Sequence, residues 1–169
     1  MAAKSFIRLV GGVFREVFGV QSSAGAANAG DVVALDDTGR IDTSMMPVGI
    51  GADTAEIAAS ESIAAGDFVN VWSDGGTPKV RKADASSAGK DAHGFVLEAA
   101  SVGNPATVYF EGTNTQVSGQ VAGIVYLQTV AGSGGNVVPN ASGNVVQQIG
   151  IATSATTVNF ERGTPVVLA

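Results

Sequence analysis

Residues 122–163 carry the pattern that decides the fold: AGIVYLQTVAGSGGNVVPNASGNVVQQIGIATSATTVNFERG. Short apolar runs rich in valine and isoleucine alternate with turns made of glycine, asparagine and serine. Such runs between such turns are typical of β-strands joined by tight connections. Residues 65–112 hold a looser version: AGDFVNVWSDGGTPKVRKADASSAGKDAHGFVLEAASVGNPATVYFEG. The two stretches predict a domain built from many short strands.

The two stretches share landmarks in the same order, which predicts two related β-units in one domain. Each opens on Ala-Gly, contains a Gly-Gly pair that we interpret as a turn, has a glycine before a later β-prone run, and closes on Val-x-Phe-Glu. Since the spacing differs between the copies, a chance likeness between chains of strands and glycine turns stays open. The paired landmarks are 65–66 and 122–123, 75–76 and 134–135, Gly94 and Gly150, and 108–111 and 158–161.

Residues 53–169 are predicted to form an all-β domain, a compact β-sandwich or β-barrel, because turn signals separate short strands throughout. Residues 1–52 are predicted to be an N-terminal extended arm and linker. The expected strands are 54–60, 67–72, 79–82, 92–99, 107–112, 115–118, 124–130, 136–139, 145–154, 156–161 and 166–168.

Composition narrows the classes of function. The chain has 169 residues and no cysteine, which excludes disulfides and zinc–thiolate sites. Its net charge is -6, with only 9 Lys and Arg, which argues against nucleic acid as a partner. Charged residues make up 14% of the chain, against about 25% in ordinary soluble domains. Depletion of charge is typical of interface cores, so an oligomeric assembly is favoured over a monomer.

Residues 4–20, KSFIRLVGGVFREVFGV, form the most apolar segment and allow two structures. A helical stripe slightly favours a short or kinked helix. Gly11-Gly12 between two β-prone runs instead suggests a hairpin, in which Arg8 would lie unfavourably opposite Arg15. The helical stripe contains Phe6, Val10, Val13, Val17 and Val20, widened by Phe14 and Phe18.

Either structure needs a partner, because an isolated short helix or hairpin is marginal in water. The segment is expected to dock on its own β domain, on a neighbouring protomer or on another protein. A membrane partner is not expected, because basic residues are few and no apolar run approaches the ~20 residues that span a bilayer. The predicted interface residues are Phe6, Leu9, Val10, Phe14, Val17 and Phe18.

Residues 21–30, QSSAGAANAG, are interpreted as a linker of small residues. After this linker, Asp36, Asp37 and Asp42 are considered as ligands of a calcium-binding loop. They lack the alternating carboxylates and the distal glutamate of a calcium loop, so no metal or other cofactor is predicted.

Catalytic candidates are sparse, and the prediction is that the protein is not an enzyme. His93 is the only histidine and follows Asp91 closely, with Ser86 and Ser87 upstream. Sequence proximity is no evidence for a triad, which is defined by geometry.

Two other groups of charged residues have a structural interpretation. Glu111 and Glu161 each follow a phenylalanine, which suits equivalent strand ends better than a pair of glycosidase carboxylates. Lysines guarding a strand edge explain a basic cluster better than contact with an acidic neighbour. That cluster comprises Lys79, Arg81, Lys82 and Lys90.

Two stretches resemble virion proteins of tailed bacteriophages. SAGAANAG at 23–30, VALD at 33–36, TGRID at 38–42 and SMMPVGIG at 44–51 are similar to an N-terminal module of such proteins. The pattern of Gly123, 125–127, 134–135, 143–147, 149–152 and 157–160 resembles the β domain of capsid decoration (cement) and head-fibre proteins.

The resemblance implies a structural homo-oligomer, commonly a trimer, on the outer surface of a bacteriophage capsid. Its partners would be the major capsid protein and copies of itself, and it would stabilise the shell. Phage tail fibres have similar N-terminal motifs. The alternative is therefore part of a tail or head fibre that binds a host-surface receptor.

Overall fold

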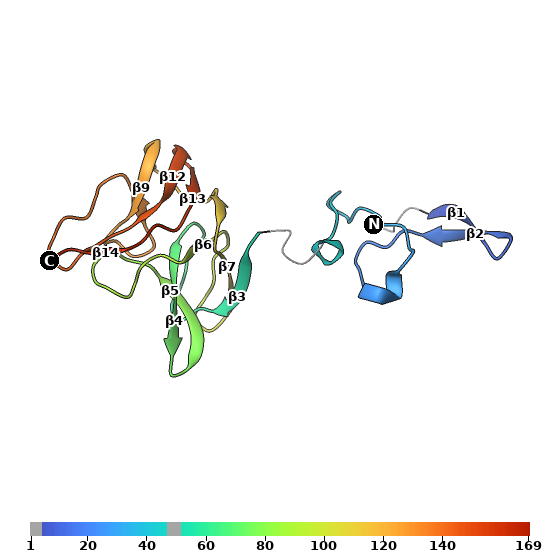
Figure 1. The fold of residues 1–169 in the computed structure, drawn as a ribbon, viewed down its shortest axis with the longest axis horizontal. Coiled ribbons are helices and arrows are strands. Elements are labelled where there is room, and N and C mark those ends of the chain that lie inside the picture. The colour runs from blue at the N-terminus through green and yellow to red at the C-terminus, as the bar shows by residue number, and fades with distance from the viewer. Residues whose placement is uncertain (1–4, 47–51) are drawn as a thin grey trace. The chain divides into compact units, whose positions relative to one another are not determined.

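The computed structural model describes residues 5–46 and 52–169. The chain divides into two compact units, Met1–Gly51 and Ala52–Ala169, which Figure 1 shows. The sequence places this boundary between residues 52 and 53. Pro47 and the glycines that signal the boundary lie outside the described residues. Each unit is described by itself.

The second unit is all-β, as predicted, and contains two five-stranded antiparallel sheets. Figure 1 labels β3 to β7 of one sheet and β9, β12 and β13 of the other, and the two sets lie in separate groups. The first sheet, in the order β3-β7-β6-β4-β5, comprises β3 (Thr54–Ala58), β4 (Phe68–Asp74), β5 (Thr77–Lys82), β6 (Gly94–Val96) and β7 (Pro105–Tyr109). The second, in the order β10-β9-β12-β13-β8, comprises β8 (Gly112–Asn114), β9 (Gly123–Leu127), β10 (Gly134–Gly135), β12 (Gln148–Ser154) and β13 (Thr157–Phe160). A separate pair joins β11 (Val145–Val146) to β14 (Val166–Val167).

The two sheets have the same topology. Numbered along the chain within each sheet, the strands lie side by side in the order first, fifth, fourth, second, third, with every pair antiparallel. The match extends to the register, so that residues at equivalent positions stand opposite equivalent partners. The Phe68 row of the first sheet is Phe68, Phe95, Tyr109 and Thr54, and the Ile124 row of the second is Ile124, Ile151, Asn159 and Thr113. The prediction of two related β-units is confirmed in topology and register.

Gly94 and Gly150 explain why one sequence landmark recurs. A Cβ on Gly94 would lie 2.4 Å from the carbonyl oxygen of Tyr109, and one on Gly150 would lie 2.1 Å from that of Asn159. Tyr109 and Asn159 are equivalent in the two rows. Each glycine therefore allows the same close approach of neighbouring strands.

The sheets pack in a sandwich-like arrangement through opposite faces. The first sheet contributes the Phe68 row to a shared core, whereas the second contributes the face that holds Val125, Ala152, Val158 and Phe160. The Phe160 ring lies 6.0 Å from that of Phe68 and 5.7 Å from that of Phe95. Hydrophobic burial of this kind is the main stabilising contribution to such a domain.

The outer face of the first sheet is covered by the chain itself. Val69, Val96 and Val108 form a second core cluster with Ile63 and Ala100, and the last two residues form an antiparallel bridge between the connecting segments. Both faces of the first sheet are therefore buried at its centre, around Phe68, Val69, Phe95 and Val96.

Several strand boundaries differ from the prediction. Gly134-Gly135 was expected to turn the chain, as Gly75-Gly76 does with positive φ of 59° and 92°, but it forms edge strand β10 opposite Tyr126 and Leu127. The run 145–154 is divided at Gln147, whose buried side chain bonds to Ala92 and Gly163 instead of a neighbouring strand. The strands expected at 115–118 and 136–139 are not strands.

The first unit begins with a hairpin, so the favoured helix is wrong. β1 (Ser5–Val10) pairs with β2 (Val13–Phe18) in antiparallel register. Gly11 and Gly12 have φ of 60° and 83°, which suits a two-residue hairpin loop and not a helix interior. Arg8 does stand opposite Arg15. Both side chains are exposed, where solvent screens their repulsion, and Arg8 donates a hydrogen bond to the Gly30 carbonyl at 3.3 Å.

The predicted linker, residues 21–30, contains the 3₁₀ turn η1 (Gly25–Asn28). The Asn28 side chain accepts a hydrogen bond from the Ala24 amide at 2.6 Å and donates one to Asp31 at 3.0 Å. A second turn, η2 (Thr43–Met45), is capped by Asp42. Small residues thus build closely bonded turns here, which composition alone does not distinguish from a flexible linker.

Candidate functional site

The hairpin of β1 and β2 carries apolar side chains on both faces. Directly opposed residues share a face, so the cross-strand pairs assign each side chain. One face holds Ile7, Leu9, Phe14 and Phe18 beside Glu16; the other holds Phe6, Val10, Val13 and Val17 beside Arg8 and Arg15. A hairpin of a soluble protein normally has one polar face. This one has apolar side chains on both faces.

Most of these side chains are accessible. Phe14 is 76% exposed and Ile7 73% exposed, and only Phe6 and Val17 are half-buried. Within residues 5–46, no hydrophobic side chain is buried; those of the core all lie between Ala59 and Phe160. The first unit therefore presents its apolar surface without a core of its own among the described residues.

The six residues predicted as an interface lie together on the hairpin, divided between its faces. Leu9, Phe14 and Phe18 occupy one face, and Phe6, Val10 and Val17 the other. The predicted interface does not include Ile7 or Val13. Val13 is part of the helical stripe, whereas Ile7 is not. Strand alternation on either side of Gly11-Gly12 is the signal that identifies both.

His93 makes structural contacts with both ring nitrogens. Its Nδ1 accepts a hydrogen bond from the Val71 amide at 3.0 Å, which leaves the proton on Nε2, 3.1 Å from Asp91 Oδ2. Arg162 also donates to that carboxylate oxygen at 3.1 Å. His93 and Asp91 do form a pair, but its recorded partners are an amide and an arginine rather than a serine nucleophile.

Ser86 bonds to a different acid. Its hydroxyl and its amide both donate to Asp84, and Lys90 Nζ lies 3.0 Å from the other oxygen of that carboxylate. Burial would raise the pKa of Asp84, but the hydrogen bonds from Ser86 and Lys90 outweigh it and hold this pKa below its usual value. The group closes the loop between β5 and β6.

Glu111 and Glu161 line one shallow depression, together with Asn159 and Arg162. The repeat accounts for this, because both acids directly follow equivalent phenylalanines, Phe110 and Phe160. Both carboxylates are exposed.

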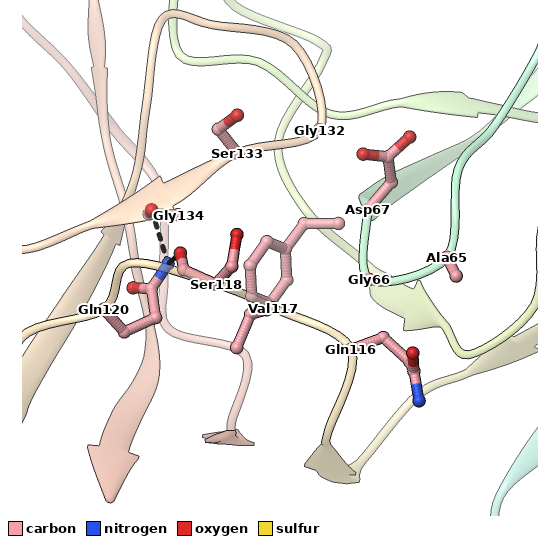
Figure 2. A pocket seen from close by; sticks show the side chains of 11 residues that line it. Ala65, Gly66, Asp67, Gln116, Val117, Ser118, Gln120, Gly132, Ser133 and Gly134 are labelled. Atoms are coloured by element: carbon pink, nitrogen blue, oxygen red, sulfur yellow. Dashed lines mark hydrogen bonds between the residues drawn. The ribbon is translucent and has the colours of Figure 1, made fainter. Parts of the chain in front are cut away.

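Figure 2 shows a pocket of about 190 Å³ beside β10. The Gln120 amide nitrogen donates to the carbonyls of Gly134 at 3.1 Å and Ser118 at 3.3 Å, as the dashed lines in Figure 2 mark. Asp67 accepts from the Ala64 amide at 2.8 Å and pairs with Lys82 at 3.3 Å. The lining offers hydroxyl, amide and carboxylate groups to water or a small polar molecule, without an imidazole that would act as a base. The lining residues are Ala65, Gly66, Asp67, Phe68, Gln116, Val117, Ser118, Gln120, Gly132, Ser133 and Gly134.

Two of the acids considered for calcium, Asp36 and Asp42, accept hydrogen bonds within local turns. Hydrogen bonds from the Arg40 amide and the Thr38 hydroxyl lower the pKa of Asp36, and the Ser44 hydroxyl does the same for Asp42. Among residues 5–46 and 52–169, no three histidine, cysteine or acidic residues are grouped as a metal site would require.

The basic cluster lies on and after edge strand β5, and each member has a partner within the second unit. Lys79 pairs with Asp74 at 2.8 Å, and Lys82 and Lys90 pair with Asp67 and Asp84. Arg81 donates to Asn70 at 3.0 Å and stacks over Trp72 with its guanidinium 4.8 Å from the ring. The outer side of β5 is itself covered, because Ala59 forms a bridge to Val80 and the Ser60 amide donates to the Val80 carbonyl at 2.8 Å. The cations are thus paired within the unit, but they do not guard an open strand edge.

Comparison with known proteins adds no relative: no family model matches the chain, and no curated protein or solved structure is detectably similar to it. In the part of the chain that the structure describes, no helix has the length and apolarity to cross a membrane.

Proposed function

We propose that the protein is a structural component of a bacteriophage virion that decorates and stabilises the outside of the capsid. The hairpin of the first unit docks on the major capsid protein. The second unit forms a rigid knob that associates with copies of itself on the outer surface. The protein performs no catalysis in this role.

The observation that carries the proposal is the hairpin with two exposed apolar faces. A two-stranded ribbon alone is marginally stable in water, so a ribbon of this composition gains most from burial against another protein. The second unit supplies a framework held by two core clusters and by internally paired cations. The low charge of the chain also suits a protein that works in a close-packed assembly.

The experiment measures binding of the purified full-length chain to phage capsids that lack their decoration, by co-sedimentation. The test variant replaces two residues of one hairpin face, Leu9→Ser with Phe14→Ser. The matched control is Val102→Ser, because Val102 is 65% exposed but lies in the second unit. Affinity is expected to fall about 100-fold in the hairpin variant and to stay unchanged in the control.

Two results would overturn the proposal. One is a hairpin variant that saturates capsids as the wild type does. The other is an image of whole particles in which the protein lies away from the head. Binding of the purified chain to host cells, without binding to capsids, would favour the receptor-binding fibre instead.

A further inference from the structure

The internal repeat shows that one sheet face lacks a cover that its counterpart has. In the first sheet, the two phenylalanines of the Phe68 row are buried: Phe68 and Phe95 are 0% and 1% exposed beneath the second sheet. In the second sheet, the equivalent Ile124 row is open, with Ile124 and Ile151 at 47% and 48% exposed. Register and strand order are the same, whereas the covering layer and the side chains of the row differ.

The strands that form the open face carry no charge, and the nearest acids, Glu111 and Glu161, lie beyond the strand ends beside Asn159, at the far end of the row from Ile124. The strands of the second sheet (β8, β9, β10, β12 and β13) contain no charged residue, whereas those of the first contain Glu56, Asp74, Lys79, Arg81 and Lys82. An antiparallel sheet that faces water normally alternates apolar residues with polar and charged ones. Here the exposed row places two isoleucines directly opposite each other, flanked by Asn159 and Thr113.

Lack of charge indicates which occupant fits this face. When a surface meets the same surface of an identical chain around a rotation axis, each charged group near the axis approaches its own copy. Such a contact is therefore favoured by a patch without charges and by apolar side chains near its centre. Ile151 lies on β12, the middle strand of the sheet, with its isoleucine partner beside it.

We propose that the open face of the second sheet, centred on Ile124 and Ile151, is the surface through which copies of this chain associate. A neighbouring copy covers the Ile124 row as the second sheet covers the Phe68 row within one chain. The inference deepens the self-association included in the proposed function. Its test is made without capsids, so that it stands or fails independently of capsid binding.

The experiment measures the mass of the full-length protein by sedimentation velocity between about 1 and 100 µM. The wild type is expected to be an oligomer. Ile151→Lys, which puts like charges face to face, is expected to weaken association at least about 100-fold. Val102→Lys makes the same change at an exposed site elsewhere in the second unit, and Phe14→Lys makes it on the hairpin; both are expected to keep the wild-type mass. Far-UV circular dichroism checks that each variant is folded.

A cysteine variant tests the contact if the lysine variant does not fold. Because the chain has no cysteine, Ile151→Cys introduces a single thiol, and mild oxidation is expected to link two chains covalently. Val102→Cys is the matched control and should stay unlinked. A monomeric wild type, an Ile151→Lys variant with wild-type mass, or equal crosslinking of both cysteine variants would each overturn the proposal.

Discussion

In the first sheet, Phe68 and Phe95 stand opposite each other and lie beneath a second layer; in the second sheet, Ile124 and Ile151 hold the same places and meet solvent. Strand order and register are shared. What differs is the number of layers that each sheet has beside it. One β framework thus provides a core in one copy and an accessible face in the other. The residues differ accordingly: aromatic rings in the first case, and isoleucines on strands without charged residues in the second.

The largest expected effect on stability comes from truncating one side chain in each row to alanine and comparing the two losses. Phe95→Ala removes a ring that is 1% exposed and contacts Phe160, so the free energy of unfolding is expected to fall by about 3–5 kcal/mol. Ile151→Ala changes the equivalent exposed position and is expected to cost about 1 kcal/mol or less. Urea denaturation, followed by the fluorescence of Trp72 at a concentration below self-association, measures both. Equal losses would mean that the two rows do not differ in burial.

The second test asks whether the equivalent glycines of the two copies, Gly94 and Gly150, are equally necessary for stability. Gly94→Ala and Gly150→Ala each push a methyl group against a carbonyl oxygen of the neighbouring strand. Each is expected to lower the free energy of unfolding by about 2–4 kcal/mol. Gly150→Ala should cost more, because its contact is closer and its φ is 137°. The control is Gly89→Ala, which also has positive φ but has nothing within 4 Å of the added Cβ. If only one of the two strand glycines is sensitive, the two close approaches do not contribute equally to stability, although strand order and register match.

The sequence predicted the all-β class, most strands and the repeat, because valine-rich runs and glycine turns act locally. It did not predict which face of each copy is buried. The run Phe68-Val69-Asn70-Val71 and the run Ile124-Val125-Tyr126-Leu127 both have side chains suited to cover on either face. The covering layers include residues far away in the chain, such as Ala100 in the cluster of Val69 and Phe160 against Phe68, which no local pattern connects.

For the candidate interface on the hairpin, the sequence predicted which residues are apolar but not their secondary structure. Hydrophobicity selected its residues, but the secondary structure predicted for them was wrong. Phe6, Val10 and Val17 fit a helical stripe as well as they fit alternate positions of a strand. Gly11-Gly12 decides between them. The cost of setting Arg8 opposite Arg15, which counted against the hairpin, is small at an exposed site.

The smallest expected effect concerns the connections that differ between the copies. In the first copy, the loop between β5 and β6 is closed by Asp84, which is 6% exposed and bonds to Ser86 and Lys90. In the second, the connection between β10 and β12 is anchored by the Gln147 side chain on Ala92. Loss of the carboxylate in Asp84→Asn is expected to lower the free energy of unfolding by about 1–2 kcal/mol at pH 7.

The pH dependence follows from the pKa of Asp84, which is lower in the folded protein than the ~3.9 of an unfolded chain. The ionised carboxylate therefore stabilises the fold fully above about pH 4, and this contribution is lost as the pH falls through the lower folded value. The difference between wild type and Asp84→Asn should shrink when urea denaturation is repeated at pH 3. Asp36→Asn makes the same replacement in the first unit and should leave the transition reported by Trp72 unchanged. A gap between wild type and Asp84→Asn that persists undiminished at low pH would show that the asparagine perturbs the loop by its shape, and that charge does not account for the loop's contribution.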